Sequence, residues 1–156
     1  MFTKYLIVFL VSMVPLMELR LAVPMAVGMG LDYWISLVVC VIGNMLPVPV
    51  IYLFARKVLV WGAGKKRVGK FFRFFLNKGE KAGQKLMAKA GRGGLFVALL
   101  LFVGIPIPGT GAWTGTLAAS ILDMDFKSSV LAVMFGVLLA GIIMMCVSFG
   151  VFGIIL

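Results

Sequence analysis

Residues 33–55 read YWISLVVCVIGNMLPVPVIYLFA, and residues 128–156 read SSVLAVMFGVLLAGIIMMCVSFGVFGIIL. Neither stretch contains an Asp, Glu, Lys or Arg residue. A helix that crosses the hydrocarbon core of a bilayer needs about 20 apolar residues. Both stretches exceed that length, and the second is long enough to cross at a tilt. The sequence therefore predicts two membrane-spanning helices.

The composition of the whole chain supports this interpretation. Of its 156 residues, 63% are hydrophobic and 13% are charged, whereas soluble domains are about 45–50% apolar and about 25% charged. A chain of this size buries only about 70% of its surface on folding, so a soluble core could not hide so much apolar surface. These values exclude a soluble globular domain, a coiled coil and a disordered chain. We predict an all-α integral membrane protein.

Two further apolar segments, residues 5–31 and 95–122, are interrupted near their centres. Glu18-Leu-Arg20, Pro15 and Pro24 interrupt the first, and Gly-Ile-Pro-Ile-Pro-Gly at 104–109 interrupts the second. Proline lacks a backbone N–H and resists continuous helix. Two half-helices of about ten residues would each reach about 15 Å, half the hydrocarbon thickness. The sequence favours a re-entrant hairpin in each segment, with a full span as the alternative.

The order of segments suggests an internal repeat within a single membrane domain, residues 1–156. Residues 1–55 and 95–156 each contain a broken segment followed by a spanning helix, and residues 56–94 join the two halves. Transporters often use such halves, with discontinuous helices that meet near the midplane. If both broken segments are re-entrant, the halves are inverted and both termini lie outside the cell. If both segments span fully, both termini lie inside.

The joining segment carries nearly all of the net charge of +10. Residues 56–92 hold twelve basic residues and one acid, Glu80, so the rest of the chain sums to −1. The positive-inside rule places this segment in the cytoplasm. Its four phenylalanines argue against nucleic acid as a partner.

Apolar residues recur at helical spacing within the joining segment, which predicts an amphipathic helix in the headgroup region. The stripe consists of Val68, Phe71, Phe72, Phe75, Leu76, Gly79, Ala82, Gly83, Leu86, Met87 and Ala90. Gly79, Gly83 and Gly91 are candidate breaks in this helix. Six cations lie elsewhere around the helix and are expected to bind anionic lipids: Lys66, Lys70, Arg73, Lys81, Lys85 and Lys89.

Glu18 and Arg20 are the first candidates for chemistry, because ionisable groups at membrane depth usually face a cavity or each other. At i and i+2 they cannot pair along a regular helix. They could pair in a non-helical tip or bond to the other half of the chain. The functional interpretation is a coupling carboxylate beside an anion-binding arginine. The alternative is a neutralised structural pair.

The block Pro106-Ile-Pro-Gly-Thr-Gly-Ala-Trp-Thr-Gly115 is the second candidate. Thr110 is expected to be the N-cap of a half-helix that runs to Ile121. The free N–H groups at such an N-terminus would suit an anion, such as a phosphate head group. Close packing through Gly111, Gly115 and Ala119 is compatible with that role. Trp113 could stack on a ligand or lie at the membrane interface.

Other residue types offer little chemistry. Asn44, with Pro47 and Pro49 nearby, could satisfy backbone groups freed by a kink. Cys40 and Cys146 lie in apolar runs outside any CxxC pair and are expected to be small apolar filler. The sequence has no His and few acids, so we expect neither a metal site nor an enzyme, and no cofactor. A GxxxxGK[ST] phosphate-binding motif is also absent, which disfavours ATP as the energy source.

The motifs Glu18-Leu-Arg-Leu-Ala-Val-Pro24 and Pro106–Gly115 resemble the putative small multidrug export protein family over essentially the whole chain. That resemblance implies drug export. The chain is more distantly similar to the DedA/VTT superfamily of lipid-handling membrane proteins. This similarity implies two facing re-entrant hairpins and movement of lipid or undecaprenyl phosphate. The second motif of that superfamily contains an Arg that is absent here.

Three functions follow as hypotheses. The first is a secondary transporter of small amphipathic, cationic or lipid-like compounds, the second is a transporter or scramblase of an anionic lipid such as undecaprenyl phosphate, and the third is a membrane scaffold with the basic helix as a lipid anchor. We expect a multi-pass protein of the inner (plasma) membrane. Four membrane segments are few to enclose a path, so we also expect a homodimer. The candidate substrate- or ion-binding residues are Glu18, Arg20, Pro24, Asn44, Pro106, Pro108, Gly109, Thr110, Gly111, Trp113 and Thr114.

Overall fold

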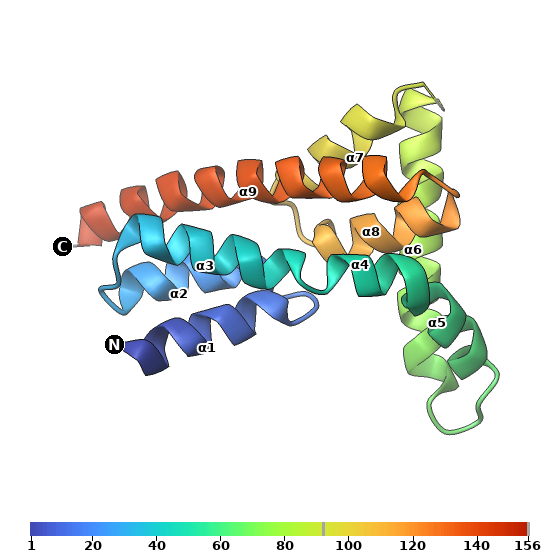
Figure 1. The fold of residues 1–156 in the computed structure, drawn as a ribbon, viewed down its shortest axis with the longest axis horizontal. Coiled ribbons are helices and arrows are strands. Elements are labelled where there is room, and N and C mark those ends of the chain that lie inside the picture. Colours follow the sequence, from blue (N-terminus) through green and yellow to red (C-terminus); the bar gives the residue numbers. More distant parts are fainter. Residues whose placement is uncertain (92, 156) are drawn as a thin grey trace.

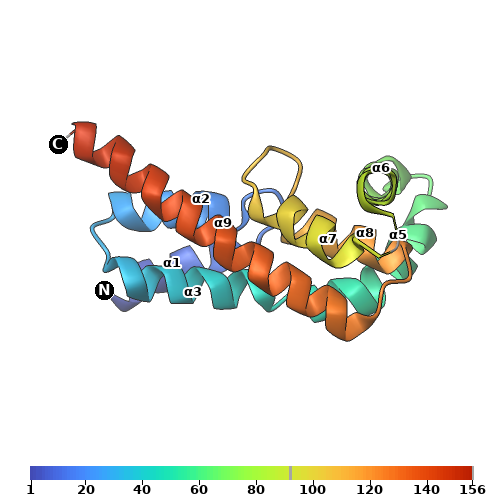
Figure 2. The ribbon, with the colours of Figure 1, turned by 90° about the horizontal axis from the view of Figure 1, so that it is seen from above.

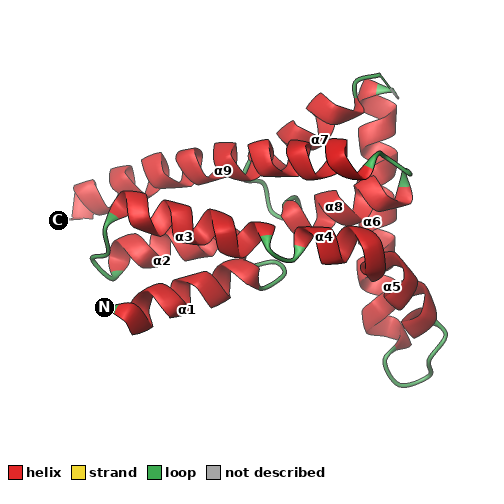
Figure 3. Cartoon of the chain, in the orientation of Figure 1, coloured by secondary structure: helices red, strands yellow, loops and turns green. Residues whose placement is uncertain are grey.

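A computed structural model of the protein describes residues 1–91 and 93–155, and within them it contains helices and no strands (Figure 3). Arg92, part of the predicted basic segment, lies outside the described residues. The helices are α1 (Phe2–Met13), α2 (Glu18–Gly28), α3 (Tyr33–Met45), α4 (Val48–Val50), the π-helix η1 (Ile51–Ala55), α5 (Arg56–Ala63), α6 (Gly69–Ala90), α7 (Leu95–Gly104), α8 (Ala112–Ile121) and α9 (Phe126–Ile155).

Two helical stretches are long and apolar enough to cross a membrane. Tyr33–Phe54 has 22 residues and a mean hydropathy of 2.2, and Phe126–Ile155 has 30 residues and a mean hydropathy of 2.8. Within the most apolar 18 residues of each stretch, only 28% and 39% are buried inside the protein. The helices of a soluble core would bury most of such a window, so these exposed apolar faces fit lipid. The prediction that these two stretches form helices long and apolar enough to span a membrane is confirmed.

The first broken segment forms an antiparallel hairpin of α1 and α2 (Figure 1). The chain reverses between them at residues 14–17. Pro15 disfavours helical backbone in the residue before it, and Val14 is accordingly extended at φ −74° and ψ 130°. The predicted break at Pro15 is confirmed, whereas the predicted breaks at Glu18–Arg20 and at Pro24 were wrong, because α2 begins at Glu18 and continues through Pro24.

The second broken segment forms a hairpin of α7 and α8 around a turn at residues 105–111. The two helices pack closely through Gly115, where an added Cβ would lie 2.6 Å from Cγ2 of Val103. Figures 1 and 2 show that the two hairpins enter the molecule from opposite ends, so that their tips meet near its centre. The predicted two-repeat relation between the halves stays a prediction.

The long helix α9 supports both hairpins, because α2, α3, α7 and α8 all contact it. It packs closely on α7 at Gly136, where an added Cβ would lie 2.7 Å from the backbone oxygen of Leu100. A side chain at position 136 would therefore separate α7 from α9. This small-residue contact is the usual way for apolar helices to pack without a hydrophobic driving force.

The stretch from α3 to α5 is kinked rather than straight, with Pro47 and Pro49 at the kink. The π-helix η1 follows directly and packs against α8. The hydroxyl of Ser120 donates to the backbone oxygen of Tyr52 at 2.9 Å, and the hydroxyl of Tyr52 donates to the backbone oxygen of Met124. The kinked helix is thus tied to the end of the second hairpin.

Helix α6 runs across one end of the other helices, and Figure 2 looks along its axis. It is continuous through Gly79 and Gly83, so the expected breaks there were wrong; it ends at Gly91, whose φ is +61°. Its apolar stripe packs on α5, α7 and α8. At Gly79 an added Cβ would lie 2.7 Å from the side chain of Leu117.

Much of the stripe is therefore covered by protein, whereas Val68 and Phe71 are exposed, at 46% and 62%. The location of α6 in the headgroup region stays a prediction. The six cations predicted to bind lipid remain on the exposed side: Lys66, Lys70, Arg73, Lys81, Lys85 and Lys89. Their binding to anionic lipid stays a prediction.

Candidate functional site

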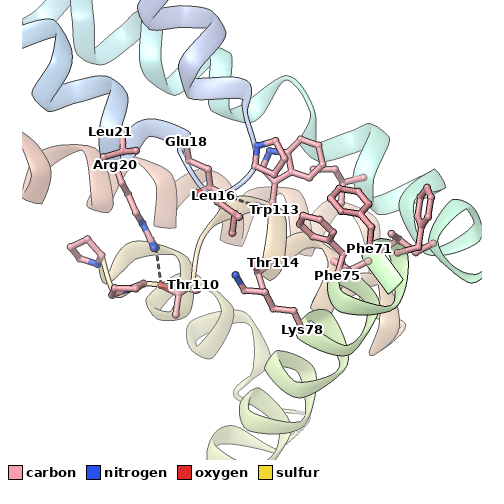
Figure 4. Close-up of a pocket in the computed structure, with 18 of the residues that line it drawn as sticks. Leu16, Glu18, Arg20, Leu21, Phe71, Phe75, Lys78, Thr110, Trp113 and Thr114 are labelled. Carbon is pink, nitrogen blue, oxygen red and sulfur yellow. Dashed lines mark hydrogen bonds between the residues drawn. The ribbon is translucent and has the colours of Figure 1, made fainter. Parts of the chain in front are cut away.

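A cavity of about 670 Å³ lies where the tips of the two hairpins meet α6 (Figure 4). This volume is within the range of about 300–1,000 Å³ typical of small-molecule sites. The cavity wall is mostly apolar, with a few polar and charged side chains. Its lining residues are Pro15, Leu16, Glu18, Arg20, Leu21, Ile51, Val58, Leu59, Phe71, Phe72, Phe75, Lys78, Pro106, Pro108, Gly109, Thr110, Trp113, Thr114, Leu117 and Met144.

Glu18, at the tip of the first hairpin, caps the N-terminus of α8 in the second hairpin. Its Oε2 accepts from the backbone N–H of Ala112 at 3.2 Å, and its Oε1 accepts from that of Trp113 at 3.1 Å. The side chain is only 5% exposed. Free N–H groups and the helix dipole favour a negative charge at this position. In this structure the N-terminus of α8 binds the protein's own carboxylate, and the binding of an external anion there stays a prediction.

The backbone around this contact is unusual on both sides. Glu18 has a φ of +49° and Leu16 has a φ of +73°. These are left-handed backbone values that residues other than glycine rarely adopt. Opposite them, Gly111 has a φ of +149°, and an added Cβ there would collide with the Glu18 carboxylate. The N-cap of α8 is Gly111, so the expectation that Thr110 would be the cap was wrong.

Arg20 binds the other end of the same turn. Its Nη1 donates to the backbone oxygen of Ile107 at 2.5 Å, and its Nη2 lies 2.8 Å from the hydroxyl oxygen of Thr110. Nη2 also lies 3.3 Å from the oxygen of Ile105 and 3.4 Å from that of Val103, at the C-terminus of α7. The carbonyl groups that end a helix favour a positive charge.

Glu18 and Arg20 therefore join the two hairpins by complementary charges, the acid at a helix N-terminus and the base at a helix C-terminus. We call these two residues, with Thr110 and the backbone groups that they bind, the interhairpin latch. Of the arrangements left open by the sequence, bonding to the other half of the chain is the one observed. Trp113 adds a third link, because its Nε1 donates to the backbone oxygen of Met13 at 3.1 Å.

A family model described as "Putative small multi-drug export protein" matches residues 18–143. The chain belongs to this family. The match begins at Glu18 and therefore contains both sides of the interhairpin latch and the whole of α6. Comparisons with curated proteins and with solved structures gave no match. The distant similarity to the DedA/VTT superfamily stays a prediction.

Most of the candidate residues of this family member come together at the cavity. Glu18 and Arg20 line it, and so do Pro106, Pro108, Gly109, Thr110, Trp113 and Thr114. Gly111 packs against the Glu18 carboxylate, where an added Cβ would collide with it. Pro24 and Asn44 are not among the lining residues: Pro24 lies within α2, and Asn44 is buried in α3, where its Oδ1 has no hydrogen-bond partner among the described residues.

The contribution of α6 to the cavity was not predicted from the sequence. Lys78 and the phenylalanines at 71, 72 and 75 form one of its walls. Lys78 is three residues after Phe75 and four before Ala82, so it lies on the apolar stripe and not with the outward cations. This spacing was the available indication that one lysine of the basic segment faces the protein.

Within the described residues, no group of three or more His, Cys, Asp or Glu side chains could hold a metal ion. Cys40 is buried and Cys146 is exposed on the apolar helix α9, and both are free cysteines.

Proposed function

We propose that this protein is a secondary transporter of small amphipathic compounds, multi-pass in the plasma membrane, and that the cavity between the hairpins is its substrate site. Its family supports a transporter role. The observation that carries the proposal is the position of the cavity: it adjoins both hairpin tips and combines an apolar wall with charged groups. Transporter sites are commonly built from discontinuous helices in this way.

The geometry supports a mechanism in which the two hairpins move relative to each other. Each hairpin enters from one end of the molecule, so the separation of one tip from the other would open the cavity toward one side of the membrane (Figure 1). Both tips expose backbone groups that lipid cannot satisfy. In the observed state the interhairpin latch satisfies several of them, and in an open state water in the cavity would replace these bonds.

The test is flux through proteoliposomes that contain the purified full chain. A cationic dye and a labelled polyprenyl phosphate are assayed for the wild type, Glu18→Gln and Arg20→Ala. We expect flux of at least one substrate in the wild type and a loss of that flux in both variants. Glu80→Gln, on the exposed side of α6, is the matched control and should retain wild-type flux.

The two other hypotheses are outcomes of the same assay. Flux of polyprenyl phosphate alone, lost in Arg20→Ala, would favour a DedA-like carrier of anionic lipid. If neither compound moves through folded wild-type protein, the proposal fails for these probes and the scaffold hypothesis gains.

A further inference from the structure

The opening of the cavity is apolar. A residue that lines the cavity and is also exposed marks the place where the cavity meets the surroundings of the protein. The exposed large side chains among the lining residues are Leu16, Leu21, Val58 and Phe71, at 59%, 52%, 48% and 62%. The other exposed lining residues are Pro108 and Gly109. None of these six residues is polar or charged, and we call them the cavity mouth.

The polar and charged side chains of the cavity are less accessible than the mouth. Glu18 is buried, and Arg20, Lys78, Thr110 and Thr114 are half-buried. On a surface that faces water the order is the reverse, because charged side chains there are mostly exposed. Apolar side chains outside and polar side chains inside are the arrangement expected of an opening that faces hydrocarbon, where an exposed charge is costly.

The cavity mouth lies in the half of the molecule next to α6. Leu16 and Leu21 belong to the first hairpin, at or near its tip, whereas Val58 and Phe71 belong to α5 and α6. Figure 4 shows Leu21 and Phe71 on opposite sides of the pocket. Because the hairpin tips lie near the centre of the molecule and α6 crosses one end (Figure 1), the mouth extends from the centre toward that end. The positive-inside rule places this end at the cytoplasmic side.

We propose that the cavity mouth is a lateral opening to the hydrocarbon phase, through which the substrate enters from the cytoplasmic half of the bilayer. The substrate class is then a compound that dissolves in the membrane, and a polar solute that stays in water does not reach the site. When no substrate is bound, the acyl chain of a lipid occupies the mouth, because an empty apolar space loses its dispersion contacts. The substrate class rests on the proposal that the cavity is the substrate site.

Trp113 lines the cavity and can report what enters it. The joint substitution of phenylalanine for Trp34 and Trp61 leaves Trp113 as the only tryptophan of the full chain. Its fluorescence is measured in nanodiscs of phosphatidylcholine, with bromine on the acyl chains as the quencher from lipid and acrylamide as the quencher from water. We expect at least twofold quenching by the brominated lipid and little quenching by acrylamide. Strong quenching by acrylamide without an effect of bromine would overturn the lateral opening.

A larger side chain at the mouth then locates the path of the acyl chain. Val58→Phe should narrow the mouth and reduce the quenching of Trp113 by brominated lipid at least twofold. Val60→Phe is the matched control, because Val60 lies on the same helix and is 57% exposed but does not line the cavity. Equal quenching in the two folded variants would overturn the proposed mouth. If Val58→Phe does not fold, Leu21→Phe narrows the mouth from the first hairpin and gives the same test.

Flux and quenching separate the two proposals. Flux of the cationic dye without quenching by brominated lipid would overturn the lateral opening and leave a transporter that is loaded from water. Quenching that depends on Val58, without flux of the dye or of polyprenyl phosphate, would support the lateral opening and contradict transport. Tetraethylammonium, a cation that stays in water, tests the substrate class: flux as fast as that of the dye would overturn entry from the membrane.

Discussion

At the scale of single residues, the decisive feature is a pair of opposite charges that do not bind each other. Glu18 binds the positive end of α8, and Arg20 binds the negative end of α7. Each charge thus lies where the helix dipole stabilises it, and both hold the second hairpin to the first. The left-handed backbone at Glu18 is the local strain that accompanies this arrangement.

Glu18→Gln tests the acidic side of the interhairpin latch. A carboxamide has one acceptor oxygen and one NH2 donor, so one of the two N–H groups of α8 loses its partner. We expect the free energy of unfolding to fall by about 1–3 kcal/mol, the cost of an unsatisfied buried donor. Thermal unfolding in detergent measures the change, with Glu80→Gln as the exposed control. Equal stability of the two variants would contradict a stabilising contact between Glu18 and the N-terminus of α8.

Arg20→Lys tests the basic side while it keeps the charge. An ammonium group cannot reproduce the planar fork that reaches Ile107 and Thr110 together. We expect a loss of about 1–3 kcal/mol in unfolding free energy. Arg73→Lys is the control, because Arg73 is exposed and its Nε donates to the backbone oxygen of Ala63 on the neighbouring helix. A loss at Arg73 as large as that at Arg20 would argue against a special role of the guanidinium fork.

At the scale of elements, α6 is the helix whose environment differs most from the expectation. An apolar stripe on a basic helix can pack on lipid or on protein, and its spacing is the same in both cases. In the structure, glycines 79 and 83 let α6 approach α8, and the stripe then closes one side of the cavity.

Gly79→Ala should separate α6 from α8. The new Cβ would lie 2.7 Å from the side chain of Leu117, which is itself buried. We expect a loss of about 1–3 kcal/mol in unfolding free energy, as is usual for overpacking. Gly150→Ala in α9, where nothing lies within 4 Å of the added Cβ, should show no such loss. If Gly79→Ala unfolds at the wild-type temperature, the packing of α6 on α8 is not as close as described.

The outward cations of α6 give a separate prediction. Added anionic lipid should raise the unfolding temperature of the wild type in detergent, since each cation near an anionic surface contributes about 1 kcal/mol. The substitution of glutamine for Lys66, Lys70, Lys81, Lys85 and Lys89 together should remove most of this increase. Lys4→Gln, at the opposite end of the molecule, is the control. The same increase in the fivefold variant would exclude an electrostatic contact between α6 and lipid.

At the scale of the whole molecule, both termini lie at the end opposite α6 (Figure 1). This placement is expected if both hairpins are re-entrant and two helices span the membrane, and the re-entrant arrangement stays a prediction. Four full spans would instead bring the termini to the same side as the basic segment.

The topology can be tested with reporter fusions in a bacterial host. Because the basic segment is expected in the cytoplasm, alkaline phosphatase fused to the C-terminus should be active outside it. The same reporter inserted after Gly64, between α5 and α6, should be inactive. An inactive phosphatase and a fluorescent GFP at the C-terminus would contradict the re-entrant arrangement.

The sequence by itself determined the membrane class, the two spanning stretches, the two broken segments and the membership of the family. These properties depend on composition, on the length of apolar runs and on local motifs, all of which act over short distances along the chain. It also identified Glu18, Arg20 and the block around Thr110 as the polar centre, because charged groups within an apolar run are costly in lipid unless they face a cavity or a polar partner.

Only the tertiary structure decided what each of these groups binds. Glu18 and Ala112 are 94 residues apart, and nothing local in the sequence indicates that a carboxylate from one hairpin will cap a helix of the other. The same holds for α6, since its stripe packs on α8, a helix of the second hairpin. The cavity and the position of Lys78 in its wall arise from long-range packing, which joins segments whose own patterns are compatible with several partners.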